Sequence, residues 1–182
     1  MTRTRGPHPP ETDSVAPGAL VFAYGSNMHL PHVRSWAEAR QHPRPQLRAL
    51  GRAELRGHRL CWNYRSRWRP GGAANVESAS KSSVHGVLLE VNPETLAILD
   101  QKEGHPIRYR RQLLSVYTAD QRPHQAWVYQ VTKPYQEEET VAPSKTYLGL
   151  LRKGGLAHHL PHQYLEELRW ERFVLDEKRH VG

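Results

Sequence analysis

An apolar strand that runs directly into a small polar loop constrains this chain most. The residues are Val21-Phe22-Ala23-Tyr24-Gly25-Ser26-Asn27-Met28. Bulky β-forming side chains over 20–24 are typical of a buried strand, whereas the Gly-Ser-Asn that follows has turn chemistry. A loop of this kind exposes several backbone N–H groups close together, and such groups bind carboxylates or developing oxyanions. The segment therefore predicts a ligand-binding loop at the end of a core strand.

Length and composition indicate one globular domain. The chain has 182 residues, of which 37% are hydrophobic, and this suits one domain that buries roughly two-thirds or more of its unfolded surface. Residues 1–18 are rich in Pro and have almost no bulky apolar side chain, so we expect a disordered N-terminal tail. The domain is then expected over 19–175, with a C-terminal tail over 176–182.

We expect a soluble cytoplasmic protein that does not bind membranes. No apolar stretch follows the first arginines as in a secretory signal, and no later apolar run approaches the roughly 20 residues that cross a bilayer. The single cysteine, Cys61, rules out an internal disulfide framework. It lies in a strand-like run, where we expect burial rather than reactivity.

The net charge of +8 at pH 7 raises nucleic-acid binding as an alternative, because Lys and Arg attract phosphates without sequence preference. The arginines are scattered, however. Arg65, Arg67 and Arg69 alternate in one loop and another group lies over 108–111, but no recognised binding module surrounds either. We therefore expect no specific nucleic-acid partner, and an anionic substrate accounts for the same charge.

The pattern of elements predicts an α+β domain. Strands are expected at 20–24, 47–55, 58–64, from about 73, 84–91, 107–118 and 124–132, with a joint around Gly57 between the second and third. Helices are expected over 30–39, from the Asn92 cap to Glu103, over 144–153 and over 161–170. Many strands followed by helices favour a mixed or largely antiparallel sheet.

Helix geometry makes Glu103 the strongest candidate for chemistry. Leu96, Leu99 and Glu103 fall at i, i+3 and i+7, so the glutamate shares a stripe with two core-facing leucines. It also lies at the negative end of the helix dipole, with an aspartate one turn earlier. All three effects disfavour the charged form, and we expect them to raise the pKa of Glu103 toward the range of a general acid or base. Lys102 and Arg108 act in the opposite direction if either reaches the carboxylate.

Two other interpretations compete at these positions. Glu103 could instead be a surface residue at a frayed helix end, paired with Arg108 or Arg110. Ser26 could be imagined as a nucleophile, but no His and acid stand in a known arrangement to activate it, and loop serines usually bond the backbone.

Three histidines near the C-terminus suggest a metal site. These are His158, His159 and His162, but Pro161 interrupts the helix that would align the first and the last. No carboxylate or cysteine supports them as ligands. We therefore expect no metal.

Five segments together resemble the γ-glutamylcyclotransferase family. They are FAYGSNM at 22–28, GGAANV at 71–76, VHGVL at 84–88, LDQKEG at 99–104 and PSKTY at 143–147. Each is similar to a family segment and they follow the family's order, over about residues 20–172. The resemblance implies a small barrel-like sheet flanked by helices.

The resemblance also implies roles for individual residues. The family's catalytic glutamate falls on Glu103, and Asp100 is then a helper that hydrogen-bonds the backbone or tunes its neighbour. Tyr147 stands where the family places a tyrosine near the substrate. The substrate-binding residues implied in this way are Ala23, Tyr24, Gly25, Ser26, Asn27 and Tyr147.

In the family's reaction, the α-amine of a γ-glutamyl group attacks its own side-chain amide carbonyl and releases 5-oxoproline and an amine. The resemblance implies this activity here, on a small-molecule γ-glutamyl substrate in glutathione-related metabolism, with Glu103 as general acid and base and with no cofactor. The alternative is a non-catalytic relative that binds a small anionic ligand or a partner through the loop 24–27. The basic loop 65–69 suits an acidic leaving amine.

Overall fold

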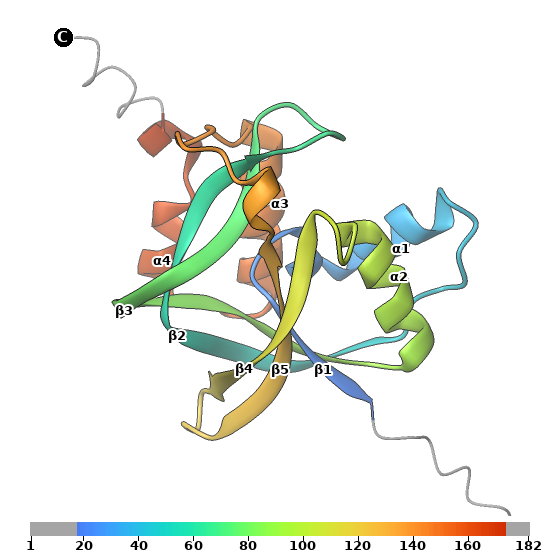
Figure 1. The fold of residues 1–182 in the computed structure, drawn as a ribbon. Coiled ribbons are helices and arrows are strands. Elements are labelled where there is room, and N and C mark those ends of the chain that lie inside the picture. The colour runs from blue at the N-terminus through green and yellow to red at the C-terminus, as the bar shows by residue number, and fades with distance from the viewer. Residues whose placement is uncertain (1–17, 174–182) are drawn as a thin grey trace, which may run out of the picture.

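A closed barrel of five strands forms the centre of the computed structural model, which describes residues 18–173 (Figure 1). The strand order is β1-β3-β2-β4-β5. Neighbouring strands are antiparallel except β1 and β5, which are parallel. The predicted α+β fold, with a mixed, largely antiparallel and barrel-like sheet, is therefore confirmed. The tails expected over 1–18 and 176–182 lie outside the described residues, except for Gly18.

Helices flank this barrel. The strands are β1 (Ala19–Ala23), β2 (Leu47–Arg65), β3 (Gly72–Val91), β4 (Tyr109–Thr118) and β5 (Pro123–Val131). The α-helices are α1 (Leu30–Glu38), α2 (Pro93–Glu103), α3 (Lys145–Ala157) and α4 (His162–Glu167), and the 3-10 helices are η1 (Ser26–Met28) and η2 (Lys133–Tyr135). In Figure 1, α1 and α2 lie together on the right of the barrel and α4 lies on the left. Within residues 18–173, no helix has the length and apolar character to cross a membrane.

The β2 and β3 strands are longer than the sequence predicts. The runs expected at 47–55 and 58–64 form one strand, β2, and the two runs expected between 73 and 91 form β3. Gly57 has a positive φ of 69°, and the β2–β3 register shifts beside it. The prediction of a joint between two strands at Gly57 was therefore wrong, because a bulge bends and twists a strand without ending it.

The α2 helix begins and ends where the sequence predicts. The Asn92 side chain accepts a hydrogen bond from the backbone N–H of Thr95 at 2.8 Å, and a proline follows the cap. Gly104 takes the left-handed conformation with φ of 70° and ends the helix. These caps fix Glu103 as the last residue of α2. Leu99 is fully buried, so the predicted stripe does face the core.

The α3 and α4 helices pack on the barrel through the side chains that the sequence predicts, all of which are buried: Tyr147, Leu148, Leu151, Leu165 and Leu168. The α3 helix also contacts η1 at a distance that only glycine allows. A Cβ atom on Gly154 would lie 2.8 Å from the backbone carbonyl carbon of Met28 and 2.9 Å from the backbone nitrogen of His29. The helix therefore supports the loop after β1 directly, backbone against backbone.

We expect Gly154→Ala to lower the free energy of unfolding by about 1 to 3 kcal/mol, because the added methyl group must push α3 away from η1. Gly149→Ala is the matched control. A Cβ atom at Gly149 meets nothing within 4 Å, so this variant should be more stable than the natural chain by about 0.5 to 1 kcal/mol through helix propensity. Urea denaturation measures the free energy of unfolding of both variants. Equal changes in the two variants would contradict the close approach of α3 to η1 at Gly154.

Candidate active site

The loop after β1 and the last turn of α2 meet across a small cavity. Its lining contains all seven residues that the sequence analysis proposes for the site, namely Ala23, Tyr24, Gly25, Ser26, Asn27, Glu103 and Tyr147. Four further residues complete the lining: Phe22, Ala74, Tyr109 and Tyr129. The cavity holds about 30 Å³, close to the volume of one water molecule in the liquid.

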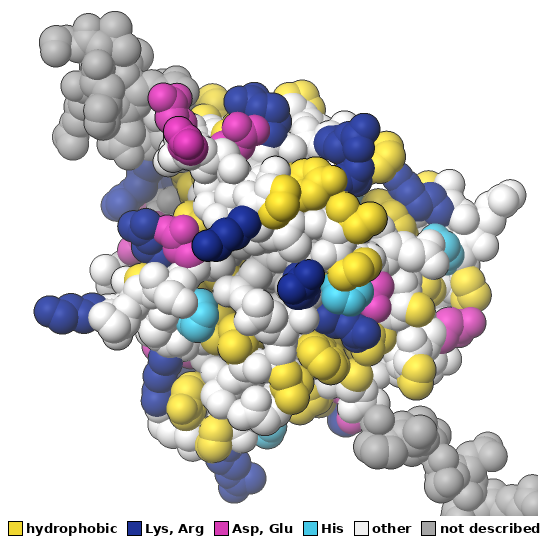
Figure 2. Space-filling view, in the orientation of Figure 1, with side chains coloured by type: hydrophobic (Ala, Val, Ile, Leu, Met, Phe, Trp, Pro, Cys, Tyr) yellow, Lys and Arg dark blue, Asp and Glu magenta, His cyan; other side chains and the backbone are white. Residues whose placement is uncertain are grey.

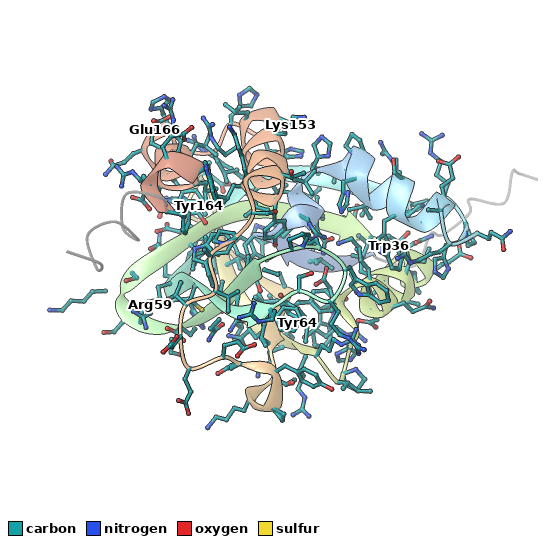
Figure 3. All side chains as sticks on the ribbon, turned by 90° about the horizontal axis from the view of Figure 1, so that it is seen from above. Trp36, Arg59, Tyr64, Lys153, Tyr164 and Glu166 are labelled. Carbon is teal, nitrogen blue, oxygen red and sulfur yellow. The ribbon has the colours of Figure 1, made fainter. Side chains whose placement is uncertain are left out.

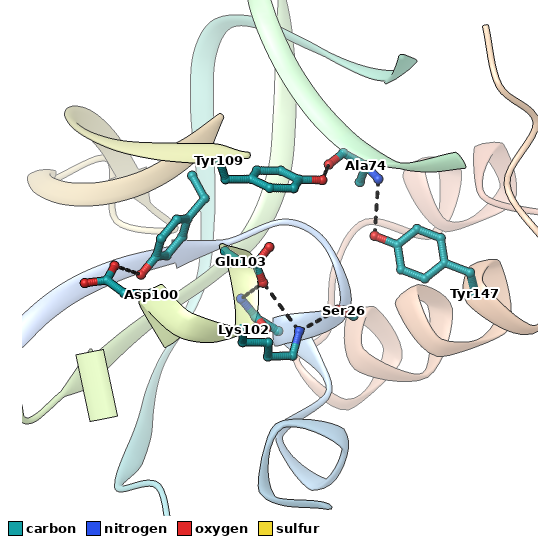
Figure 4. Close-up of polar contacts among 9 residues, drawn as sticks. Ser26, Ala74, Asp100, Lys102, Glu103, Tyr109 and Tyr147 are labelled. Carbon is teal, nitrogen blue, oxygen red and sulfur yellow. Dashed lines mark hydrogen bonds and ion pairs between the residues drawn. The ribbon is translucent and has the colours of Figure 1, made fainter. Parts of the chain in front are cut away.

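Glu103 is the one acidic residue that lines this cavity, and its side chain is 16% exposed. Its Oε1 accepts a hydrogen bond from Asn27 Nδ2 at 3.0 Å and lies 3.4 Å from Lys102 Nζ. Its Oε2 makes no hydrogen bond to any residue in the described range. In Figure 4 the second oxygen points away from Lys102. The protein therefore holds one carboxylate oxygen, and the other has no protein partner within residues 18–173.

Lys102 is the cation that reaches the carboxylate. Its side chain is only 5% exposed, and its Nζ also donates a hydrogen bond to Ser26 Oγ at 3.1 Å. Burial lowers the pKa of Lys102, and the negative charge of Glu103 acts in the opposite direction. The structure thus differs from the alternative of a surface glutamate paired with Arg108 or Arg110. The hydrogen-bond partner of the Ser26 hydroxyl is Lys102, and within residues 18–173 no histidine bonds that serine.

Tyrosine hydroxyls form the opposite wall of the cavity (Figure 4). The Tyr109 hydroxyl donates to the backbone carbonyl of Ala74 at 2.9 Å, and the Ala74 N–H donates to the Tyr147 hydroxyl at 3.2 Å. The backbone N–H and C=O of one β3 residue, Ala74, are therefore bonded by side chains of α3 and β4 respectively. Burial raises the pKa of Tyr109 well above its ordinary value and raises the pKa of Tyr147 to about 12. Both hydroxyls therefore stay protonated near neutral pH.

Tyr24 and Asp100 belong to a second series of hydrogen bonds. The Tyr24 hydroxyl donates to the backbone carbonyl of Tyr129, and the Tyr129 hydroxyl donates to Asp100 Oδ1 at 2.7 Å. The other oxygen of Asp100 lies 3.3 Å from Arg111 Nη2. The sequence analysis expects Asp100 to bond the backbone or to tune its neighbour, whereas its partners in the structure are two side chains. Through Tyr129, Asp100 orients the cavity wall.

The loop itself presents backbone donors and a close approach. Gly25 precedes η1, and the first N–H groups of a helix have no acceptor within that helix. A Cβ atom on Gly25 would lie 3.3 Å from the Tyr147 hydroxyl, so a larger residue would press on the tyrosine. The Asn27 Oδ1 atom is buried and has no hydrogen-bond partner within residues 18–173. The loop therefore combines backbone N–H groups that have no acceptor within η1 with a buried acceptor, Asn27 Oδ1.

Of the alternating arginines, Arg69 is the one that lies against the site. Its guanidinium lies 4.6 Å from the centre of the Tyr147 ring, whereas Arg65 lies 3.5 Å from Glu137 on the surface. On the face shown in Figure 2, Lys and Arg side chains are spread out and do not form one continuous patch.

The other candidate residues do not join the site. Across residues 18–173, no group of three or more His, Cys, Asp and Glu side chains could hold a metal ion. Cys61 is half-buried, and burial raises the pKa of its thiol to about 12, in line with the expected low reactivity.

Sequence reasoning missed part of the lining. Phe22 and Ala74 lie inside the segments 22–28 and 71–76, so those segments carried the signal. Tyr129 had no such signal, because the face of β5 that it occupies depends on how the barrel closes. Lys102 was considered only as a possible neighbour of the carboxylate, and its contact with Ser26 was not foreseen.

We expect stability to fall as the pH rises above about 10. The folded-state pKa of Tyr147 is about 12 and exceeds the unfolded value near 10, so the folded state retains a proton that the unfolded state loses. Between about pH 10 and 12, Tyr147→Phe should make the fall of unfolding free energy less steep by about 1.4 kcal/mol per pH unit. Urea denaturation at a series of pH values measures this slope.

Val128→Ala is the control for this slope. It removes fully buried apolar atoms but no hydroxyl, so it should lower stability at every pH and leave the slope unchanged. If the unfolding free energy of Tyr147→Phe falls with pH as steeply as that of the natural chain, the raised pKa of Tyr147 is contradicted.

Comparison with known proteins agrees with this geometry. The family model described as Gamma-glutamyl cyclotransferase, AIG2-like matches residues 21–149. A solved gamma-glutamyl cyclotransferase is similar over 83% of this chain and 86% of its own, with 24% identity and a TM-score of 0.72. An uncharacterized human protein, loc79017, covers the same shares with 26% identity and a TM-score of 0.70. YkqA from Bacillus subtilis matches 83% of this chain and 52% of its own, with 23% identity and a TM-score of 0.67.

A search of curated proteins by sequence gave no match. The family match nevertheless extends from β1 into α3 and includes every residue that lines the cavity. The chain therefore belongs to the gamma-glutamyl cyclotransferase, AIG2-like family.

Proposed function

We propose that the protein is a γ-glutamylcyclotransferase-type enzyme. It releases 5-oxoproline and a free amine from a γ-glutamyl amino acid or a γ-glutamyl amine. The observation that carries the proposal is the position of Glu103, which faces the loop 24–27 with one oxygen held by Asn27 and one oxygen free. Membership of the family supports the same class of reaction.

Glu103 acts in this proposal first as a base and then as an acid. It takes a proton from the α-ammonium of the substrate, and the freed amine attacks the γ-carbonyl carbon. The new C–N bond closes a five-membered ring, the old amide C–N bond breaks, and Glu103 returns the proton to the departing amine. The ring nitrogen gives up a second proton as the lactam forms, and the amine leaves with it as an ammonium ion. Both reacting groups belong to one molecule, so orientation supplies much of the rate and no external nucleophile takes part.

The loop after β1 is proposed to hold the glutamyl head. The buried, unpartnered Oδ1 of Asn27 suits an N–H of the α-ammonium, because a buried acceptor without a donor is costly. The N–H groups at the start of η1 suit a carboxylate or the developing oxyanion. Tyr109 and Tyr147 already bond Ala74, so they shape the wall and position the reacting carbonyl.

The substrate needs more room than the small cavity provides. Beyond Glu103 lies a second cavity of about 60 Å³, which shares Ser26, Glu103, Tyr109 and Tyr147 with the first. Lys102 lines this second cavity, as do the long side chains of Arg69 and Arg108. Displacement of Lys102 on binding would join the two spaces around the carboxylate.

A non-catalytic relative that only binds an anionic ligand or a partner through the loop 24–27 is the alternative, since a fold does not fix a function. The enzyme is favoured because a carboxylate beside an anion-binding loop opposes anion binding, whereas general acid–base chemistry requires it. A yeast gamma glutamyl cyclotransferase specific to glutathione has the same fold, with 14% identity and a TM-score of 0.52. That likeness concerns the fold alone, so glutathione is one member of the substrate panel below.

Glu103→Gln should lower the rate of 5-oxoproline release by about 10²- to 10⁴-fold, because the amide keeps the shape of the side chain but cannot accept the proton. The measurement is 5-oxoproline formation from a panel of γ-glutamyl dipeptides, γ-glutamyl amines and glutathione. Thermal unfolding of the variant checks that the fold is retained.

Glu94→Gln is the matched control, because it makes the same chemical change at an exposed position in the first turn of α2. It should retain the full rate. Full activity in Glu103→Gln would show that the base is another group. No 5-oxoproline from the natural chain on any member of the panel would favour the binding alternative.

A further inference from the structure

A large groove begins where the candidate site ends. It has a volume of about 740 Å³ and shares Lys102 and Tyr147 with the cavities around Glu103. Its walls come from α1, from the loop between β2 and β3, and from α3. Figure 3 shows α1, which carries Trp36, beside α3, which carries Lys153. The volume lies within the range of about 300 to 1,000 Å³ that is typical of sites for small molecules.

The charge of the groove is positive throughout. Arg40, Arg69, Lys102 and Lys153 line it, and its lining contains no Asp or Glu. Within residues 18–173, neither Arg40 nor Arg69 nor Lys153 forms an ion pair with an acidic side chain. His32 also lines the groove. Burial lowers its pKa to about 4, and the positive charges of Lys102 and Arg69 add to this effect. The lining of the groove therefore carries an excess of positive charge.

Flat rings face the same space. The guanidinium of Arg40 lies 4.3 Å from the ring centre of Trp36 and 5.9 Å from that of Trp68. Trp68 is 73% exposed, which is unusual for the largest apolar side chain. These rings come from segments 32 residues apart in the sequence (68 minus 36), so the fold gathers them at the groove. An exposed ring, Trp68, beside the cationic Arg40 suits a planar group that carries a negative charge.

We infer that this groove binds the leaving amine of the substrate, and that this amine carries both an aromatic ring and a negatively charged group. This inference rests on the proposed function. The γ-glutamyl head occupies the cavity at Glu103, the scissile amide lies near Lys102 and Tyr147, and the leaving amine extends into the groove. Its ring packs against the exposed Trp68, because Arg40 and His42 already contact the Trp36 ring. Its carboxylate faces Arg69 and Lys153. A γ-linked aromatic amino acid is the simplest substrate of this class.

Two substrates that differ by one carboxylate test the inference. They are γ-glutamyl-tyrosine and γ-glutamyl-tyramine, which share the head, the scissile amide and the ring. We expect kcat/KM to be at least about tenfold higher for γ-glutamyl-tyrosine, mainly through a lower KM, because a charge-assisted contact is lost in the other compound. Equal kcat/KM for the two compounds would overturn the inference and would leave the proposed function in place.

Gly149 offers a matched pair of variants within the groove. A Cβ atom there meets nothing within 4 Å, so Gly149→Glu adds a negative charge to the lining and Gly149→Gln adds the same volume without the charge. Relative to Gly149→Gln, Gly149→Glu should lower kcat/KM for γ-glutamyl-tyrosine by about tenfold and change that for γ-glutamyl-tyramine far less. An equal effect on both substrates would overturn the charge assignment.

A binding measurement separates the inference from the proposed reaction. If neither compound yields 5-oxoproline, the proposed function fails, and tryptophan fluorescence then reports binding of both compounds to the natural chain and to the two Gly149 variants. Tighter binding of γ-glutamyl-tyrosine that Gly149→Glu weakens more than Gly149→Gln supports an anionic aromatic ligand in the groove. Equal binding of the two compounds, or no quenching by either, overturns it. A short single-stranded oligonucleotide that competes for the groove with higher affinity would also overturn it.

Discussion

The β1 strand is hydrogen-bonded on both edges, and the geometry of the site depends on this double pairing. It runs antiparallel to β3 over five residue pairs and parallel to β5 where Val21 faces Trp127. A strand fixed on both sides cannot slip by one residue without turning its core side chains outward. The loop at its end is therefore held in place. The caps of α2 fix Glu103 independently, and the Asn27–Glu103 hydrogen bond joins the two constraints.

Polar groups are concentrated in this region although burial normally disfavours them. Ser26 and Asn27 are buried, and the Lys102 side chain is nearly so. Such groups are tolerated when each has a partner. Lys102 donates hydrogen bonds to both Ser26 and Glu103, and the Asn27 side-chain amide also donates to the Glu103 carboxylate. The Oδ1 atom of Asn27 has no hydrogen-bond partner within residues 18–173. The residue that carries this unsatisfied atom lines the cavity, which is the proposed ligand site.

Local signals in the sequence predicted α2 in detail, because its cap, its apolar stripe and its terminal glycine all act within one helix. The same signals placed Glu103 on the buried face. They could not show that Gly57 bends β2 without ending it, since a bulge and a turn use the same residue and differ only in the pairing of the strands. Nor could they orient Tyr129 or Lys102, whose contacts depend on barrel closure and on a long side chain reaching back to Ser26.

Two successive residues of α2 carry opposite charges into the same space, because the Lys102 ammonium lies 3.4 Å from the Glu103 carboxylate. Their two charges offset each other. A zwitterion can enter this space without adding net charge to low-dielectric surroundings, whereas a ligand with a single sign of charge cannot. An amino acid head with a free α-amine and a free α-carboxylate is a zwitterion. In the proposed function, the neighbouring positions of these two residues would therefore favour an unmodified head, whatever is attached to its far end.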